Sequence, residues 1–90
     1  MSDLAGLVLL TRPDCDLCEE FLAEFAAHLP ATTAPPLRRL PVDSDATLVR
    51  RYGLKIPVLL LDGELVCWGR FDPAELDRLL GAPARRRERL

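Results

Sequence analysis

Residues 11–20 read TRPDCDLCEE, and they place Cys15 and Cys18 directly after the apolar run LAGLVLL. A continuous apolar run without helical periodicity is typical of a strand covered on both faces, so the sequence predicts a strand over about residues 6–11. Behind the cysteines, apolar residues recur at spacings of three and four, which predicts an amphipathic helix over about residues 15–28. The apolar stripe of this helix comprises Leu17, Phe21, Leu22, Phe25 and Leu29. The cysteine pair therefore lies where a buried strand passes into a helix.

The stretch after this helix predicts a second strand and a second helix. PATTAPP, residues 30–36, has the composition of a turn and begins with Pro30, which stops the first helix; LRRLPV, residues 37–42, is typical of a short strand. In DSDATLVRRYG, aspartate and serine are candidate N-caps, and Gly53 stands where a left-handed residue often closes a helix. We expect a short helix that ends at this glycine.

A β-hairpin is predicted by IPVLLLDGELVCW, residues 56–68. Two apolar strands, at 57–61 and 64–68, flank Asp62 and Gly63, a pair that accepts the positive φ angles of a two-residue turn. The two strands are therefore expected to pair antiparallel.

A last helix is expected after the hairpin. Asp72 can cap its N-terminus, with Pro73 at the first helical position and Glu75 two residues further on. Its inward face and its end are formed by Leu76, Leu79, Leu80 and Gly81.

The order of elements is then β-α-β-α-β-β-α, which predicts an α/β fold. A strand, a crossover helix and a second strand form a right-handed parallel unit, and the hairpin adds antiparallel strands, so we expect a four-stranded mixed sheet flanked by three helices. Ninety residues suit one small domain. We assign residues 1–83 to this domain and residues 84–90 to a basic, disordered C-terminal tail.

Composition and charge exclude several classes of protein. Hydrophobic residues make up 49% and charged residues 29%, the balance of a soluble globular chain. The apolar run at the N-terminus is far shorter than the roughly 20 residues that span a bilayer, and Met1-Ser2-Asp3 lacks the positive start of a signal peptide. We therefore expect a cytoplasmic protein without membrane association.

The charges are divided unevenly along the chain. Residues 1–83 carry 8 basic and 13 acidic side chains, whereas the tail has a net charge of +3. An acidic body does not suit phosphate contacts, so nucleic acid is not an expected partner. The tail is expected to be solvated, and the alternative is a weak contact with acidic protein or nucleic acid.

The spacing of Cys15 and Cys18 suits a redox couple. One helical turn separates them, which a disulfide can bridge, and the dipole and free N–H groups at the helix start favour a thiolate at Cys15. We expect Cys15 to attack and the more buried Cys18 to resolve the mixed disulfide. Acidic neighbours raise a thiol pKa, so we predict a potential near the reducing end of the range. The acidic neighbours are Asp14, Asp16, Glu19, Glu20 and Glu24.

Two other interpretations of the pair are open. The cysteines can be small apolar residues at a helix start, or ligands of a metal. A closed zinc site needs four ligands, and Cys67 and His28 are the only further candidates, so we expect no metal unless two chains share one. Cys67 is expected to fill the core, with a redox role as the alternative, and His28 to stabilise a helix C-terminus. Three cysteines are too few for a secreted disulfide framework, which favours a reducing compartment.

With these residues in place, the chain resembles a glutaredoxin-like member of the thioredoxin superfamily over about residues 5–81. TRPDCDLCEE, RRYGLKIPVLLLDG and WGRFD are most similar to small bacterial glutaredoxin-like proteins that form a family of unknown function. The resemblance implies a thioredoxin/glutaredoxin-like fold and an active cysteine pair. It also implies that Pro57 is a cis-proline facing the cysteines and that the backbone of Ile56 pairs with the substrate.

The resemblance also suggests how glutathione would bind as a co-substrate. Arg12 occupies the position of a basic residue that helps to bind this tripeptide in glutaredoxins, and Gly69 and Asp72 retain part of a Gly-Gly motif followed by a polar helix cap. Trp68 replaces the first glycine of that motif. Asp16-Leu17 replaces the Pro-Tyr between the two cysteines.

WGRFDP shares its Trp, Phe and Pro with a segment of the glutaredoxin-like redoxins that thioredoxin reductase recharges. The alternative is that Trp68 and Phe71 are buried under the last helix. We therefore expect a monomeric thiol–disulfide oxidoreductase that needs no cofactor and reduces disulfides of proteins or of small molecules, with glutathione or thioredoxin reductase as its reductant. The alternative is a non-enzymatic domain of the same fold that binds a protein or a metal.

Overall fold

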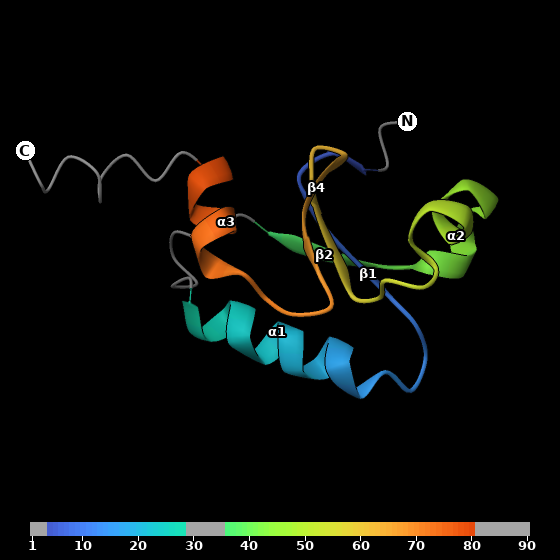
Figure 1. The fold of residues 1–90 in the computed structure, drawn as a ribbon, viewed down its shortest axis with the longest axis horizontal. Helices are drawn as coiled ribbons and strands as arrows, with labels where there is room; N and C mark the ends of the chain where they lie inside the picture. Colours follow the sequence, from blue (N-terminus) through green and yellow to red (C-terminus); the bar gives the residue numbers. More distant parts are fainter. Residues whose placement is uncertain (1–3, 29–35, 81–90) are drawn as a thin grey trace, which may run out of the picture.

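Four strands and three α-helices alternate in the order β-α-β-α-β-β-α in the computed structural model, which describes residues 4–28 and 36–80 (Figure 1). The order is the one expected from the sequence. The elements are β1 (Leu7–Thr11), α1 (Asp16–His28), β2 (Leu37–Pro41), α2 (Ala46–Tyr52), β3 (Val58–Leu61), β4 (Glu64–Trp68) and α3 (Pro73–Leu79).

The strands form one mixed sheet in the order β2-β1-β3-β4. β1 pairs parallel with β2, as a crossover through α1 requires, and antiparallel with β3, while β3 and β4 form the hairpin. All five residues of β1 are buried because this central strand is covered on both faces. The mixed four-stranded sheet flanked by three helices is therefore confirmed.

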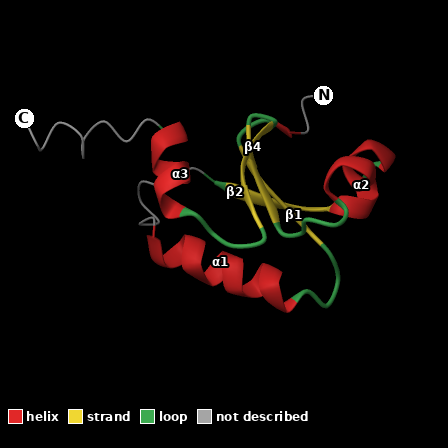
Figure 2. Ribbon diagram, in the orientation of Figure 1, coloured by secondary structure: helices red, strands yellow, loops and turns green. Residues whose placement is uncertain are grey.

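Each face of the sheet has its own apolar core. Leu7 and Leu9 point to one face and pack with residues of α1 and α3, whereas Val8 and Leu10 point to the other and pack with Leu48 of α2. Figure 2 shows the same division, with α1 and α3 on one side of the sheet and α2 on the other. Each fully buried side chain of this size stabilises the fold by about 1.5–3 kcal/mol relative to an exposed one.

The hairpin turn has the predicted geometry. Asp62 and Gly63 both have positive φ angles, 51° and 84°, which a two-residue turn of this type requires. The carboxylate of Asp62 also accepts a hydrogen bond of 2.7 Å from the N–H of Gly6, so the turn is fixed to the start of β1.

Side-chain caps begin α2 and α3 as expected. The carboxylate of Asp45 accepts from the N–H of Thr47 at 2.7 Å, and that of Asp72 accepts from the N–H of Glu75 at 3.1 Å. Each bond satisfies a backbone donor that has no partner inside the helix.

The prediction of a left-handed Gly53 is wrong. Gly53 has φ −57° and continues the helical hydrogen bonding, because its N–H donates to the carbonyl of Val49 at 2.8 Å. A Cβ at this position would lie 2.5 Å from the same carbonyl oxygen. Glycine is therefore required here by a close backbone approach and not by a positive φ.

Other boundaries differ little from those expected. β2 is one residue shorter because Val42 begins a short 3-10 helix, Val42–Ser44. Several expectations concern residues outside the described ranges. They are most of the 30–36 turn, the helix ends expected at Pro30 and Gly81, and the 84–90 tail. None of the helices in the described ranges has both the length and the hydrophobicity that a bilayer crossing requires.

Candidate active site

Cys15 and Cys18 form a disulfide at the start of α1, with their Cα atoms 5.2 Å apart. Cys15 immediately precedes the helix, and its carbonyl accepts the N–H of Glu19 at 3.2 Å, so Cys15 is the N-cap residue. Its Sγ accepts a hydrogen bond of 3.1 Å from the N–H of Cys18. A free donor of the first helical turn is therefore directed at the sulfur of Cys15, which favours a thiolate there once the disulfide is reduced.

The two sulfurs differ in accessibility. Cys18 is 0% exposed and belongs to the buried residues of α1, whereas Cys15 is partly exposed. The expected difference in burial between the cysteines is confirmed. An external thiol or disulfide can therefore approach Cys15 but not Cys18.

Cys15 lies in an open groove of 440 Å³ between the loop after β1 and the loop before β3. Ile56, the residue whose backbone is expected to pair with substrates, lines the same groove. The lining residues are Arg12, Pro13, Asp14, Cys15, Gly53, Leu54 and Ile56.

Pro57 adjoins this groove and is buried. The Ile56–Pro57 peptide bond is cis, as the resemblance implied. The carbonyl of Pro57 accepts a hydrogen bond of 2.7 Å from the N–H of Gly69, whose φ is +78°. Gly69 is thereby fixed beside the cis-proline, although it lines a different hollow, together with Leu17 of α1.

The guanidinium of Arg12 donates a hydrogen bond to the carbonyl of Gly53, 41 residues away in the sequence. This carbonyl lies just past the C-terminal end of α2, where a positive charge is favourable. Arg12 therefore joins the loop that leads to Cys15 to the loop that leads to Pro57. The binding of a substrate by Arg12 stays a prediction.

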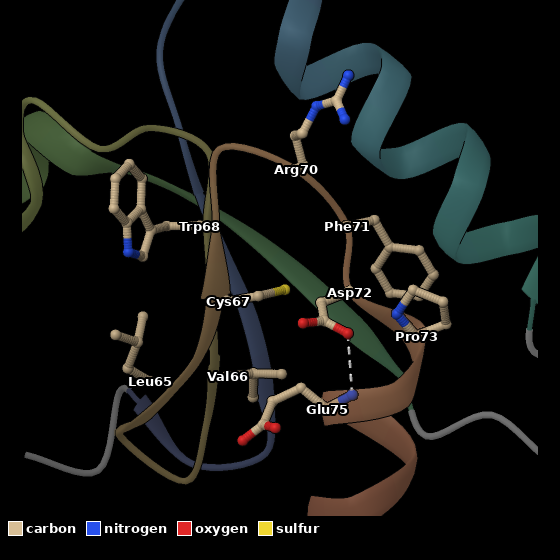
Figure 3. Close-up of a pocket in the computed structure, with 9 residues that line it drawn as sticks. All are labelled: Leu65, Val66, Cys67, Trp68, Arg70, Phe71, Asp72, Pro73 and Glu75. Atoms are coloured by element: carbon tan, nitrogen blue, oxygen red, sulfur yellow. Dashed lines mark hydrogen bonds between the residues drawn. The ribbon is translucent and has the colours of Figure 1, made fainter.

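Asp72 lies apart from the Cys15 groove. It lines an open depression next to β4 together with Cys67 and Glu75 (Figure 3). Burial raises the pKa of the Cys67 thiol, a hydrogen bond from the backbone N–H of Asp72 lowers it, and the carboxylates of Asp72 and Glu75 raise it. Cys67 is therefore held as a protonated thiol at neutral pH.

Trp68 and Phe71 do not share one environment. Phe71 is only partly buried and packs edge-to-face against Phe21 and Phe25 of α1, with ring centroids 5.3 and 6.0 Å apart, so the alternative of a Phe71 buried under the last helix holds only in part. Trp68 is 50% exposed, so its expected burial is wrong. β4 is an edge strand, and the ring of Trp68 is covered instead by the Nζ of Lys55, 5.1 Å from the ring centroid.

Carboxylates surround the N-terminal half of α1 as the sequence indicates, and all five are exposed to solvent. Glu19 forms an ion pair of 3.0 Å with Arg39. Within the described parts of the chain, the other four have no ion pair. These four are Asp14, Asp16, Glu20 and Glu24. The start of α1 therefore carries several negative charges, while Arg12 lines the same groove as Asp14 and Cys15.

His28 lies at the other end of α1 from the cysteines and interacts with Asp77. Its Nε2 lies 3.0 Å from the carboxylate of Asp77 and joins the end of α1 to α3. In the described ranges, no group of three or more His, Cys, Asp or Glu side chains is arranged to hold a metal ion.

The sequence patterns did not indicate that Gly53 and Leu54 help to form the groove or that Lys55 covers Trp68. Gly53 accepts the Arg12 hydrogen bond, Leu54 lines the groove, and Lys55 covers Trp68. The one available signal was Leu54, an apolar residue in a turn between a glycine and a lysine. Leu17 is also misassigned, because it is 52% exposed and does not belong to the buried stripe of α1.

A cysteine pair at the N-terminus of a helix, beside a cis-proline on a mixed sheet, defines a thioredoxin-like fold with a CxxC motif. The family model described as Glutaredoxin-like domain (DUF836) matches residues 6–81, and the chain belongs to this family. The function of this family is unknown.

Two solved structures are similar to the chain. A crystal structure of a structural genomics target protein from X. campestris has 35% sequence identity and a TM-score of 0.61, covering 86% of this chain and 97% of that one. A solution NMR structure of a protein from Nitrosomonas europaea has 28% identity and a TM-score of 0.68, covering 86% and 87%. Among curated proteins, none matches the chain.

Proposed function

We propose that the protein is a thiol–disulfide oxidoreductase that uses the Cys15–Cys18 couple to reduce disulfides of proteins or small molecules. The observation that carries the proposal is the disulfide between an accessible Cys15 and a buried Cys18, with the N–H of Cys18 directed at the sulfur of Cys15. Two incidental apolar residues need no such difference in burial and no such hydrogen bond.

The reaction begins with the reduced pair. The Cys15 thiolate attacks one sulfur of the substrate disulfide, which forms a mixed disulfide and releases the first substrate thiolate. The Cys18 thiol, on losing its proton, attacks Sγ of Cys15 and releases the second. Two electrons pass to the substrate, and its two thiolates take up the proton lost by Cys18 and one from solvent, so that it leaves as two thiols and the enzyme is left as the Cys15–Cys18 disulfide.

The substrate is held by groups around Cys15 in this proposal. The backbone of Ile56, ahead of cis-Pro57, pairs with the substrate chain, and Gly69 leaves room beside it; Asp72 orders the start of α3 behind this loop. A second dithiol or two molecules of a monothiol restore the reduced pair. The candidate reductants are glutathione and thioredoxin reductase, acting on a cytoplasmic monomer that needs no cofactor.

The test measures reduction of the pair first and turnover second. Dithiothreitol should reduce the isolated disulfide, and the thiol count should rise by two relative to the oxidised protein. The reduced enzyme should then cleave insulin or a mixed disulfide of glutathione in repeated cycles, with glutathione or thioredoxin reductase as electron source. The Cys15→Ser variant is the matched control and should be inactive. A pair that is reduced but supports no turnover in either system would overturn the enzyme proposal.

A further inference from the structure

Leu54 is a fully exposed leucine at the rim of the groove that contains Cys15. Its side chain is 99% exposed, more than any other large apolar residue in the described ranges. It lies between α2 and β3 and lines the groove together with Cys15 and Ile56. Isolated apolar side chains are common on protein surfaces, so exposure alone identifies no function. The position beside the reactive sulfur and the structure of the loop distinguish this residue.

The turn that carries Leu54 is held on both sides by hydrogen bonds. The N–H of Lys55 donates to the carbonyl of Tyr52 at 2.8 Å, and the carbonyl of Gly53 accepts from the guanidinium of Arg12. The exposure of Leu54 is therefore a property of an ordered turn. An ordered backbone loses little conformational entropy when a partner covers the side chain that it carries.

Further apolar groups lie at the same end of the sheet. The C-terminal end of β1 lies beside the N-terminal end of β3, because Leu10 pairs with Val58. The C-terminal end of β4 lies at the same end of the sheet, because Val58 also pairs with Trp68. Leu17 projects from the first turn of α1, two residues past Cys15, and is half exposed. Leu54, Leu17 and Trp68, which come from three separate segments, thus lie at the end of the sheet where Cys15 is located.

We propose that Leu54, presented by Arg12 through the carbonyl of Gly53, is the contact by which a protein substrate docks beside Cys15, so that the site accepts disulfides in apolar protein surfaces in preference to glutathione. This inference rests on the oxidoreductase function proposed above. Arg12 is a positioning residue in this arrangement.

Three features disfavour glutathione at the same site. The basic group expected to hold the tripeptide is already bonded to the carbonyl of Gly53. Trp68 stands where glutaredoxins have the first glycine of their Gly-Gly motif, and Lys55 lies over its ring. Four carboxylates in and next to the first turns of α1, which form no ion pair within the described residues, repel an anionic tripeptide, whereas a protein surface with apolar or basic residues meets no such repulsion. These carboxylates are those of Asp14, Asp16, Glu20 and Glu24.

The experiment compares two substrates with one reductant. Dithiothreitol drives the reduction of insulin and, separately, of a mixed disulfide of glutathione, each corrected for the uncatalysed rate. For Leu54→Ser we expect kcat/KM with insulin to fall about tenfold, chiefly through KM, as expected when one central apolar contact is lost. The kcat/KM with the glutathione disulfide should not change, and neither should the rate at which dithiothreitol reduces the oxidised enzyme. Leu65→Ser is the matched control. It removes a different exposed leucine, which lies in β4 outside the groove, and it should behave as the unmodified protein.

Arg12→Met separates positioning from ligand binding. A positioning role predicts a raised KM for insulin at unchanged kcat and an unchanged rate with the glutathione disulfide. A glutathione-binding role predicts the opposite pattern, a loss confined to the glutathione disulfide, and would overturn the inference.

Two further outcomes would also overturn it. Leu54→Ser with unaltered insulin kinetics would remove the docking role, and an unmodified enzyme that uses the glutathione disulfide as efficiently as insulin would remove the preference. In both cases the pair still turns over, so the oxidoreductase function stands. A protein that reduces neither substrate contradicts the function itself, and the inference with it.

Discussion

The backbone N–H of Cys18 lies 3.1 Å from Sγ of Cys15, so the helix that carries the buried cysteine donates a hydrogen bond to the exposed one. The bond exists because Cys15 is the N-cap of α1 and Cys18 is its third residue, the usual donor to an N-cap side chain. The same spacing permits the disulfide and, after reduction, stabilises negative charge on the sulfur that a substrate meets. One local arrangement thus supports both redox states.

Separate serine substitutions should distinguish the two cysteines. Cys15→Ser should abolish exchange because no accessible thiol remains at the site, and Cys18→Ser should accumulate the mixed disulfide because nothing resolves it. Mass spectrometry after incubation with a disulfide substrate would detect the added mass. Cys67→Ser is the control and should react as the unmodified protein. Retained dithiol turnover in Cys15→Ser would reverse the assignment of roles.

The reduction potential should lie below about −180 mV, toward the reducing end of the range for this chemistry. Carboxylates near Cys15 disfavour its thiolate, and a less stabilised thiolate makes the reduced pair less favoured. Equilibration with glutathione buffers, followed by thiol alkylation, measures the potential.

Removing the negative charge of Asp14, next to Cys15 in the sequence, should shift this potential upward. Asp14→Asn should raise it by about 10–30 mV because the reduced form becomes more favourable. Asparagine tolerates the positive φ of 55° at this position, so the backbone is retained. Asp43→Asn, which alters an exposed carboxylate before α2, should leave the potential unchanged. A lowered potential in Asp14→Asn would contradict the electrostatic argument.

The hydrogen bond from Arg12 to Gly53 should contribute to stability as well as to the shape of the groove. Arg12→Met retains the aliphatic stem and removes the donor, so we expect the free energy of unfolding to fall by about 1 kcal/mol. Urea denaturation followed by circular dichroism measures the change. Arg50→Met removes an exposed arginine that bonds to Thr47 of the same helix, α2, and should cost much less. Equal losses in the two variants would show that the bond to Gly53 has no special weight.

Most of the fold follows from local patterns in the sequence. The continuous apolar run predicted the central strand, and the Asp-Gly pair predicted the hairpin, because each depends on burial or backbone geometry within a few residues. Asp45 and Asp72 were recognisable as caps for the same reason. The position of the cysteine pair and the unequal burial of its members follow from the boundary between strand and helix.

Sequence patterns failed at one local contact and at two contacts between distant segments. Gly53 was assigned a left-handed conformation because glycine often has one at a helix end, but here the close approach to Val49 determines the residue. Trp68 was expected to be buried, yet it ends an edge strand and pairs with Lys55. The bond between Arg12 and Gly53 joins residues 41 positions apart, and no local pattern indicates it.

Phe71 should be important for the packing of α1 against the loop before α3. Its ring contacts Phe21, Phe25 and the His28 imidazole, all within 6.0 Å between centroids. Because Phe71 is only partly buried, we expect Phe71→Ala to lower the free energy of unfolding by about 2–3 kcal/mol, below the range for a fully buried phenylalanine. Phe71→Leu should lose much less, since it keeps most of the apolar volume. Denaturant titrations of both variants test this, and equal losses would contradict the packing argument.

Cys67 should react slowly with thiol reagents at neutral pH. Burial and the carboxylates of Asp72 and Glu75 raise its pKa, so less thiolate is present at pH 7 than for an ordinary cysteine. Its alkylation rate should therefore keep rising through the pH range in which a free cysteine has already reached its plateau. A rate profile with iodoacetamide, measured on protein whose Cys15–Cys18 pair is kept oxidised, isolates this thiol.

One variant and one unfolding experiment separate the causes of the slow reaction of Cys67. Glu75→Gln removes one carboxylate and should move the profile modestly to lower pH, because burial is the larger cause and is unchanged. Unfolding in urea should restore the profile of an ordinary cysteine. Rapid alkylation of the folded protein at pH 7 would show that the thiol is accessible and ionised, and would reopen a redox role for Cys67.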